Sequence, residues 1–173
     1  MSEYIDLYDV DRQLTGDTME RKDKQAADRF RLIAHVCIFD RDGRMLIQKR
    51  ASTKSIRPGC WDFSAGGGVS AGETSRMAAR RETYEELGLD IDFSNHRPVA
   101  SINFWGGFDD FYTIEIDSEG LEFALQEEEV EAVKWADADE ICEMIDEGNF
   151  IDFGKELIRY LFVAREDKGP WKL

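Results

Sequence analysis

The chain contains several short runs of apolar and β-branched residues that have the pattern of strands. Two pairs of these runs flank turn signals, RDG at 41–43 and GG at 106–107, so each pair is predicted to form a hairpin. The predicted strands cover residues 4–8, 31–40, 44–50, 98–105, 108–117 and 130–135.

Three further segments have the pattern of helices. Thr74 can cap a helix that runs to about Leu87, and Gly88 is placed to end it in the left-handed conformation. Two more helices are predicted over residues 137–147 and 152–166. The last helix carries apolar residues at helical spacing that we expect to be buried: Leu157, Ile158, Leu161 and Phe162.

Strands interleaved with helices predict an α/β sandwich with a mixed sheet. The length of 173 residues and the hydrophobic content of 42% suffice for one domain with a core, and no linker or repeat divides the chain. We therefore expect a strand or arm at residues 1–29, polar and turn-rich after residue 8, packed on a domain at 30–166. Residues 167–173 are expected to form a tail.

The composition disfavours several kinds of site. The net charge of −15 would repel a nucleic-acid backbone, so no nucleic-acid polymer is expected as a partner. Cys37, Cys60 and Cys142 are widely separated and lack a CxxC spacing, which predicts buried free thiols instead of disulfides or a zinc site. Without a run of ~20 apolar residues or a secretory signal, the protein is expected to be cytoplasmic, with no membrane partner.

The helix predicted after Thr74 carries three carboxylates within five residues. Because a helix advances about 100° per residue, Glu82 and Glu86 lie about 40° apart, and Glu85 lies about 60° to the other side of Glu82. Like charges at this spacing cost an isolated helix roughly a few tenths of a kcal/mol per pair. A solvated acidic face needs no function, so these residues alone do not establish a site.

The segment before this helix, GGGVSAGE at 66–73, is a glycine-rich turn of the kind that lets backbone approach a ligand. Mg²⁺ takes oxygen ligands and is commonly shared between one or two carboxylates and the phosphates of a substrate. A divalent cation among the carboxylates would relieve their repulsion. The pattern therefore favours a Mg²⁺ site, with Mn²⁺ as the alternative.

The spacing of these residues resembles the signature of the Nudix hydrolases, G-x5-E-x7-R-E-U-x-E-E-x-G-U, in which U is aliphatic. Gly67, Glu73 and RETYEELGL at 81–89 match it, with one departure at Thr83, which occupies the first aliphatic position. Being β-branched, Thr83 can still pack against a core. The resemblance implies the α/β/α sandwich of that family over about residues 30–165.

The same resemblance implies a metal site in a loop–helix–loop segment. Glu82, Glu85 and Glu86 would bind one or more Mg²⁺ ions, and Gly67 would offer its carbonyl oxygen. The implied reaction is substitution at a diphosphate, in which the cations neutralise charge on phosphoryl oxygens and lower the pKa of the attacking water.

Further residues would assist this reaction. Arg81 would hold Glu73 and so orient the acidic helix. The base that takes the proton of the water is, in this family, often a glutamate of the box, where Glu85 is a candidate, or one in a loop downstream. That loop offers Glu127, Glu128 and Glu129. We favour Glu129, next to the predicted strand start, although an ordinary acidic loop would have the same composition.

A finer resemblance covers nearly the whole chain. The segments YIDLYDVDRQLTG, LIAHVCIFDRDGRMLIQKR and GCWDFSAGGGVSAGE are similar to the Nudix subgroup related to isopentenyl-diphosphate isomerase. That isomerase protonates and deprotonates carbon, and needs a cysteine opposite a glutamate together with histidine metal ligands. Gly66, Gly68 and Arg31 occupy the positions of those groups, and Cys60 lies six residues too early, so we favour hydrolysis.

The two histidines of the chain do not supply the missing ligands. His35 lies in a predicted strand, where a structural histidine is expected, and His96 lies in the loop SNHRP at 94–98. The isomerase therefore stands as the second hypothesis.

The sequence determines the substrate less closely. Basic residues near the glycine loop can meet phosphates or act as solvated surface charges: Lys49, Arg50, Lys54 and Arg57. Aromatic residues around the second turn can stack a nucleobase, at ~1–3 kcal/mol, or fill the core: Phe104, Trp105, Phe108 and Tyr112. We select Arg50, Trp105 and Phe108 as the substrate-binding candidates.

Three hypotheses follow from this sequence. The first is a Mg²⁺-dependent hydrolase that cleaves a nucleoside diphosphate derivative or a related organic diphosphate. The second is the isomerase, and the third is a binding module without catalysis. A pure scaffold has no need of carboxylates at a repulsive spacing, which opposes the third. A homodimer through the arm or the sheet edge is compatible with the sequence.

Overall fold

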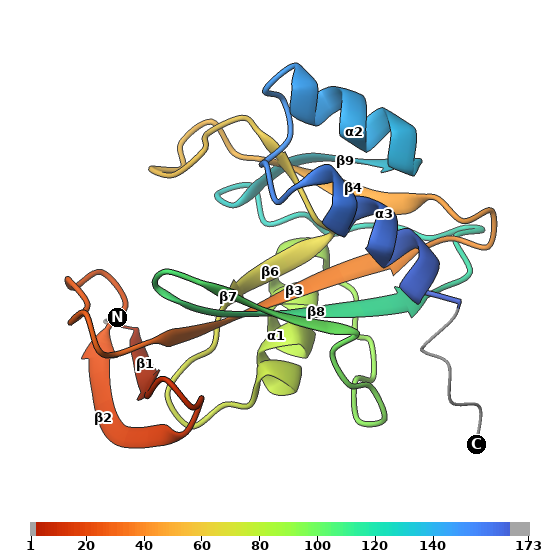
Figure 1. Cartoon of the computed structure of the whole chain (residues 1–173). Coiled ribbons are helices and arrows are strands. Elements are labelled where there is room, and N and C mark those ends of the chain that lie inside the picture. Colours follow the sequence, from red (N-terminus) through yellow and green to blue (C-terminus); the bar gives the residue numbers. More distant parts are fainter. Residues whose placement is uncertain (1–2, 167–173) are drawn as a thin grey trace.

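A seven-stranded sheet forms the centre of the computed structural model, which describes residues 3–166 (Figure 1). The predicted tail at 167–173 lies outside the described residues. The strands of this sheet are β3 (Arg31–Phe39), β4 (Met45–Arg50), β5 (Trp61–Asp62), β6 (Ala65–Gly68), β7 (Ala100–Phe104), β8 (Gly107–Glu115) and β9 (Val130–Ala136).

The sheet is mixed, as predicted. Its strands lie in the order β5-β4-β3-β8-β7, with β6 also pairing with β3 and β9 also pairing with β4. The β3–β8 pair is parallel, whereas the other pairs are antiparallel. The predicted β7–β8 hairpin is confirmed. The predicted β3–β4 hairpin pairs only at Phe39 and Met45, because β3 then continues beside β6 and β8.

Three helices pack on the sheet: α1 (Ser75–Leu87), α2 (Ala138–Asp146) and α3 (Lys155–Ala164). The Thr74 side chain caps α1 by accepting from the Met77 amide, and Gly88 ends it in the left-handed conformation at φ 73°, as predicted. The α3 helix begins later than the predicted residue 152, since Gly154 has φ 90°.

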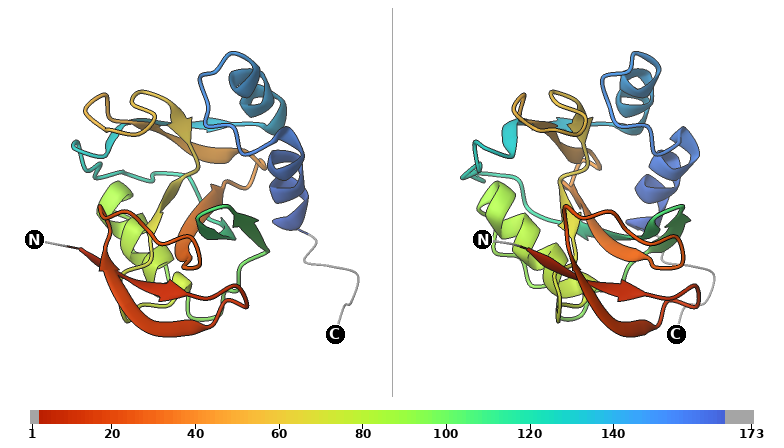
Figure 2. Two further views of the ribbon diagram at one scale, coloured as in Figure 1. Left: turned by 60° about the vertical axis from the view of Figure 1, so that its left-hand side comes forward. Right: turned by 90° about the vertical axis from the view of Figure 1, so that its left-hand side faces the viewer.

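Alternate residues of β3 face two separate cores, which gives the chain its α/β/α layers. Leu32, Ala34 and Val36 pack with α1 in one core, whereas Cys37 and Phe39 pack with α2 and α3 in the other. Figure 2 shows α1 on one side of the strands and α2 and α3 on the other. The α/β fold with a mixed sheet is therefore confirmed.

The residues predicted to be buried differ in how far the structure buries them. Ile158 and Leu161 of α3 are fully buried, whereas Leu157 and Phe162 are only partly buried. Cys37 and Cys142 are buried free thiols, as predicted, whereas Cys60 is partly exposed because it lies in the loop before β5.

The N-terminal segment forms a hairpin of two strands, β1 (Tyr4–Tyr8) and β2 (Leu14–Glu20). The predicted strand at 4–8 is confirmed. The hairpin lies at the end of the molecule farthest from α2 (Figure 2). Ile5 and Leu7 are buried, so β1 is packed against the rest of the protein along its inner face.

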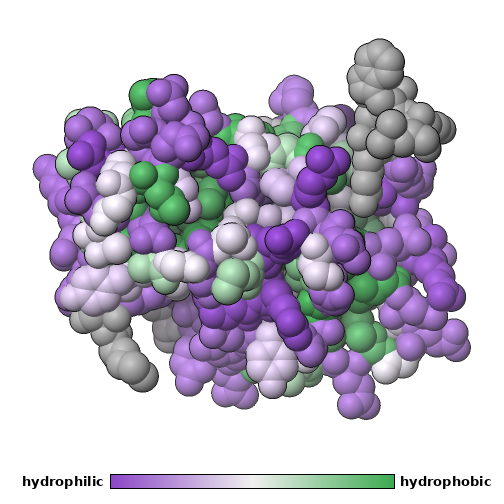
Figure 3. Space-filling view, turned by 90° about the horizontal axis from the view of Figure 1, so that it is seen from below, coloured by the Kyte–Doolittle hydropathy of each residue, from purple (hydrophilic) through white to green (hydrophobic). Residues whose placement is uncertain are grey.

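Hydrophilic side chains cover most of the face seen in Figure 3, with apolar residues in separate patches, in keeping with the net charge of −15. Within residues 3–166, we find no helix with the length and apolar character needed to span a membrane.

Candidate active site

The acidic helix α1 lies against the free edge of β6. Among the described strands, β6 pairs with β3 alone. Side chains of α1 form hydrogen bonds with the backbone on the other edge of β6. The Gly66 amide donates to Glu86 Oε2 (3.0 Å), and Arg81 Nη2 donates to the Gly68 carbonyl (3.1 Å). Buried backbone groups need such partners, which explains why charged side chains of α1 point inward.

Glu82 and Glu86 lie side by side in the interior, at 7% and 5% exposure. Burial, followed by the charge of Glu82, raises the pKa of Glu86 to about 8. Burial also raises the pKa of Glu82, against the opposing effect of Arg81. Gln48 Nε2 donates to Glu86 Oε2 at 3.0 Å, so this carboxylate has a polar partner but no cationic one among its hydrogen bonds.

Gly67 brings the backbone against these carboxylates. A Cβ atom at this position would lie 2.1 Å from Glu82 Oε1, a distance that no side chain tolerates. Only glycine therefore lets β6 approach the acidic pair so closely. The structure thus places Gly67 at the carboxylates, as the sequence suggested.

Arg81 organises the start of the site. Its Nε and Nη2 atoms donate to the two oxygens of Glu73, both at 2.9 Å, and its Nη1 donates to Glu82 Oε1 at 2.7 Å. Burial opposes ionisation of Glu73, but the hydrogen bonds from Arg81 and Ser70 outweigh it and lower the pKa of Glu73. The geometry agrees with the predicted role of Arg81 in holding Glu73.

Glu85 differs from its two neighbours. Its side chain is 49% exposed, and its Oε2 atom accepts from Arg81 Nη1 at 3.1 Å. The structure therefore brings together Glu82 and Glu86, whereas Glu85 lies on the solvent side of Arg81.

The donor chemistry of this pair suits a hard divalent cation, because carboxylate oxygens are its preferred ligands. A second buried carboxylate beside Glu82 is costly because Arg81 pairs with Glu82 but not with Glu86, and the raised pKa of Glu86 expresses that cost. Within residues 3–166, however, no group of three acidic, histidine or cysteine side chains is placed to hold a metal ion. A third ligand would require Glu85 to leave Arg81, or a substrate oxygen.

A cavity of about 330 Å³ lies beside β6, lined in part by Gly66, Gly67 and Gly68. Its volume is in the range of small-molecule sites. Three arginines line it: Arg21 after β2, Arg31 on β3 and Arg50 on β4. The predicted candidate Arg50 is therefore in the cavity, where it lies 3.5 Å from Asp62 Oδ2 and donates to the Ile56 carbonyl.

The cavity also contains polar residues whose place in a site the sequence did not predict. His35 Nε2 lies 3.2 Å from Asp109 Oδ1, and the imidazole stacks on Phe111 with ring centroids 4.8 Å apart. Burial raises the pKa of Asp62, with His35 and Arg50 opposing the shift. The register of the parallel β3–β8 pair puts Asp109 opposite Ile33 and Phe111 opposite His35, so Asp109 and His35 lie two residues apart on the same face of the sheet. The sequence alone does not fix this register.

The two selected aromatic candidates, Trp105 and Phe108, lie outside the cavity. Phe108 is 5% exposed and packs edge-on against Tyr8, so its prediction as a stacking residue is wrong. Its place on the α1 face of β8 commits the ring to the core. Trp105 is 91% exposed at the β7–β8 turn and does not line the cavity, whereas Phe104 does.

The downstream acidic loop touches the end of α1. The Gln126 amide donates to the Glu86 carbonyl at 3.2 Å, and Glu127 and Glu128 are exposed. Glu129 is partly buried and forms an ion pair with Lys54. Glu129 is outside the cavity lining, so its assignment as a base stays a prediction.

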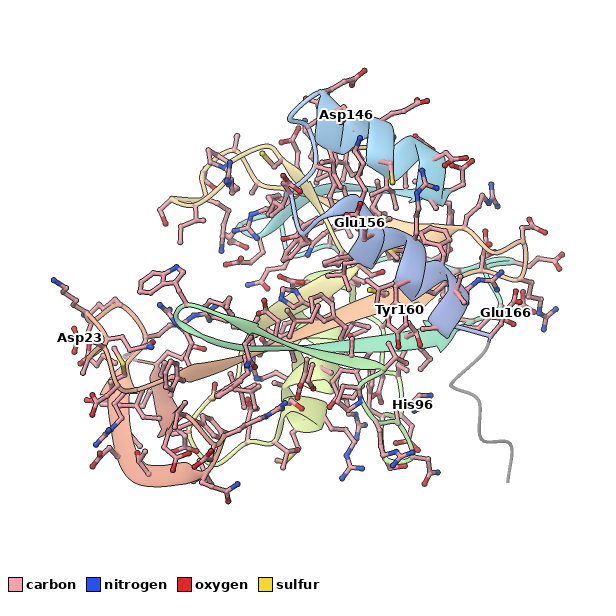
Figure 4. The ribbon with its side chains drawn as sticks, in the orientation of Figure 1. Asp23, His96, Asp146, Glu156, Tyr160 and Glu166 are labelled. Carbon is pink, nitrogen blue, oxygen red and sulfur yellow. The ribbon has the colours of Figure 1, made fainter. Side chains whose placement is uncertain are left out.

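The positions compared with the isomerase also have defined places. Gly66 and Gly68 lie in β6, and Arg31 lines the cavity with its Nε atom buried and without a hydrogen-bond partner in the described part of the chain. His96 lies on the loop between α1 and β7 and is not part of the cavity lining (Figure 4).

Residues 29–165 match the NUDIX domain family. An uncharacterized Nudix hydrolase of Listeria innocua is 43% identical over 148 residues, which cover 86% of this chain and 88% of that protein. The uncharacterized Nudix hydrolase YfcD of Escherichia coli K12 is 32% identical over 151 residues, which cover 84% of this chain and 80% of that protein.

Among solved structures, DR0079 from Deinococcus radiodurans is similar with a TM-score of 0.77 and 25% identity, covering 92% of this chain and 99% of that chain. A MutT NUDIX hydrolase from Burkholderia pseudomallei has a TM-score of 0.55 and 23% identity, covering 77% of this chain and 95% of that chain. At 23% identity, the similarity to the Burkholderia pseudomallei structure shows the fold alone.

Proposed function

The chain belongs to the Nudix hydrolase family, and from that premise we propose that it is a Mg²⁺-dependent enzyme that cleaves the diphosphate linkage of a nucleoside diphosphate derivative or a related organic diphosphate. Nudix hydrolases generally use divalent metals and act on phosphoanhydride bonds. Mn²⁺ is the alternative cation. The main support for the proposal is the buried pair Glu82 and Glu86, which lies against Gly66 and Gly67, two glycines that also line the arginine-lined cavity.

The chain supplies complementary groups for such a substrate. Arg31 and Arg50 offer guanidinium groups that match phosphate oxygens. Glu82 and Glu86 would hold the cation, and Glu85 would join them on leaving Arg81. When bound, the cation would neutralise phosphoryl charge and lower the pKa of an attacking water.

Two residues position the acidic helix in this proposal. The paired hydrogen bonds of Arg81 with Glu73 tie α1 to the loop before it, and the bond from Arg81 Nη2 to the Gly68 carbonyl ties α1 to β6.

Glu129 is proposed as the base that accepts the proton of the water, which requires its ion pair with Lys54 to open. Glu85 is the alternative base, since its carboxylate is accessible to solvent.

A substrate screen tests the proposal. The protein is incubated with nucleoside diphosphates, nucleoside triphosphates, nucleoside diphosphate sugars and isopentenyl diphosphate, with Mg²⁺ or with EDTA. Phosphate release after phosphatase coupling and isomer formation are both measured. We expect Mg²⁺-dependent hydrolysis of at least one nucleoside diphosphate derivative.

The same screen separates the alternatives. Formation of the isomer of isopentenyl diphosphate would favour the isomerase, and an absence of turnover with every compound would favour a binding module. Either result contradicts the proposed hydrolase.

A further inference from the structure

The N-terminal hairpin is attached directly to the loop that leads into α1. The Ala71 amide donates to the Tyr4 carbonyl at 2.8 Å, and Tyr8 and Phe30 exchange two backbone hydrogen bonds at 2.8 and 2.9 Å. Ile5 is only 3% exposed. The hairpin is thus a fixed part of the fold and not a loose arm.

This hairpin brings two residues to the cavity: Ile5, in β1, and Arg21, which directly follows β2. Both oxygens of Glu3 accept from Arg21 Nη1 at 3.0 Å, which orients the guanidinium. Its Nε atom lies 3.4 Å from the point where a Cβ atom on Gly68 would be. Arg21 therefore presents a positive charge beside Gly68 of β6.

A second contact fixes the far end of the hairpin. Arg12, in the turn between β1 and β2, forms an ion pair with Asp110, whose side chain is 1% exposed. The Ser101 hydroxyl also donates to Asp110, and the Arg12 guanidinium lies 5.5 Å from the centroid of the Phe108 ring. Neither member of the ion pair lines the cavity, so the pair acts on the cavity only through the hairpin.

Resting on the proposed hydrolase function, we infer that the N-terminal hairpin is part of the substrate site. Arg21 binds the phosphate end of the substrate, and the Arg12–Asp110 pair is a positioning device that holds Arg21 in place. Planar guanidinium groups suit phosphate oxygens, and Arg21, Arg31 and Arg50 converge on one cavity from three different elements. A protein of net charge −15 needs such a local concentration of positive charge to hold an anion.

The test measures binding directly, with methylenediphosphonate as a non-hydrolysable probe in the presence of Mg²⁺, by calorimetry. We expect Arg21→Ala to weaken binding about tenfold or more, since a hydrogen-bonded charge pair is lost. Lys22→Ala is the matched control. Lys22 follows Arg21 in the chain, its side chain is 78% exposed, and it lies outside the cavity. Its replacement should leave the affinity for the probe unchanged.

The positioning role is tested with the double variant Arg12→Gln/Asp110→Asn, which removes both charges and leaves neither buried alone. For this double variant we expect weaker binding of the probe and a higher KM with little change in kcat. Arg12→Lys, which keeps the positive charge, should lose less affinity than the double variant. In the Arg21→Ala background the double variant should add no further loss of affinity, because both act through the same guanidinium.

Each outcome bears on the inference. Equal affinity of Arg21→Ala and the wild type overturns it, and the hydrolase proposal then still stands if the wild type turns over its substrates. A loss from the double variant that adds fully to that of Arg21→Ala overturns the positioning role. A wild type that neither binds the probe nor hydrolyses any diphosphate overturns both proposals.

Discussion

The helices α1 and α2 are both rich in acidic residues, yet their carboxylates have opposite environments. In α2, Asp139, Glu143 and Asp146 are exposed, and only apolar side chains such as Ile141 face the core. Figure 4 places Asp146 on α2, well away from α1. In α1, by contrast, two glutamates are buried beside a glycine strand.

The number of acidic residues on a helix therefore does not mark a site. The carboxylates of α2 have water or exposed partners, as in the ion pair of Asp139 with Arg159, so their charges cost little. Glu82 and Glu86 lose their contact with water on burial, and in its place they accept hydrogen bonds from one arginine and a few neutral donors. Buried charge at such a cost is concentrated at functional sites, which favours a functional role for this pair.

The largest expected effect is on turnover. Glu86→Gln keeps the shape and the hydrogen-bond acceptor of the side chain but removes its charge, so we expect the rate to fall by about three orders of magnitude. Glu143→Gln, on the exposed face of α2, is the matched control and should keep the wild-type rate. Equal rates for both variants would remove the distinction between the two helices.

Arg81→Ala should have the largest effect on stability. It leaves Glu73 and the buried Glu82 without their cationic partner, so we expect the free energy of unfolding to fall by about 3 kcal/mol. Arg80→Ala is the control, because Arg80 pairs with Asp90 on the surface and should contribute less than about 1 kcal/mol. Urea denaturation of both variants measures the difference, and similar losses would contradict the assigned geometry.

The metal-free protein should also respond to pH. The pKa of Glu86 is raised from 4.5 to about 8 in the folded state, so the folded state binds more protons than the unfolded state between these values. Stability from this group is therefore fully present below about pH 4.5 and is lost as the pH rises through about 8. The free energy of unfolding should fall by at least about 1 kcal/mol over this range.

Glu86→Gln should make that part of the pH profile flatter, since the titrating group is gone. A wild-type profile that rises between pH 5 and pH 8, in the presence of EDTA, would contradict the buried state of Glu86. Thermal unfolding at a series of pH values provides the measurement.

The smallest effect is expected from Glu85. Its side chain is half exposed, so Glu85→Gln should change the stability of the metal-free protein by less than about 0.5 kcal/mol. Glu86→Gln should instead raise it at pH 8, because a repelled buried charge is removed. Calorimetric unfolding of the two variants in EDTA compares them, and equal shifts would place both glutamates in the same environment.

Much of the fold could be predicted because local signals and packing agreed. Thr74 and Gly88 mark both ends of α1, and apolar runs mark the central strands. The candidate site could also be predicted, because Gly67, Glu73 and the glutamates of α1 lie within one continuous segment of the sequence. The inward orientation of Glu82 and Glu86 follows from the unpaired edge of β6, which no spacing reveals.

The cavity could not be predicted because it is assembled from distant segments. Arg21, His35 and Asp109 meet only after the hairpin docks and β3 pairs in parallel with β8. Phe108 was misassigned because the phase of β8, and hence which aromatic residues face the core, depends on its register with β3.

The proposed function requires Glu82 and Glu86 to hold a divalent cation beside the cavity. Calorimetric titration of Mn²⁺ into the protein with methylenediphosphonate, at pH 7 in two buffers of different ionisation enthalpy, tests it most directly. We expect saturable uptake with release of protons from the wild type, because Glu86 must ionise, and strongly reduced uptake by Glu82→Gln and Glu86→Gln. Uptake by these variants equal to that of the wild type, or no uptake by the wild type, would contradict it.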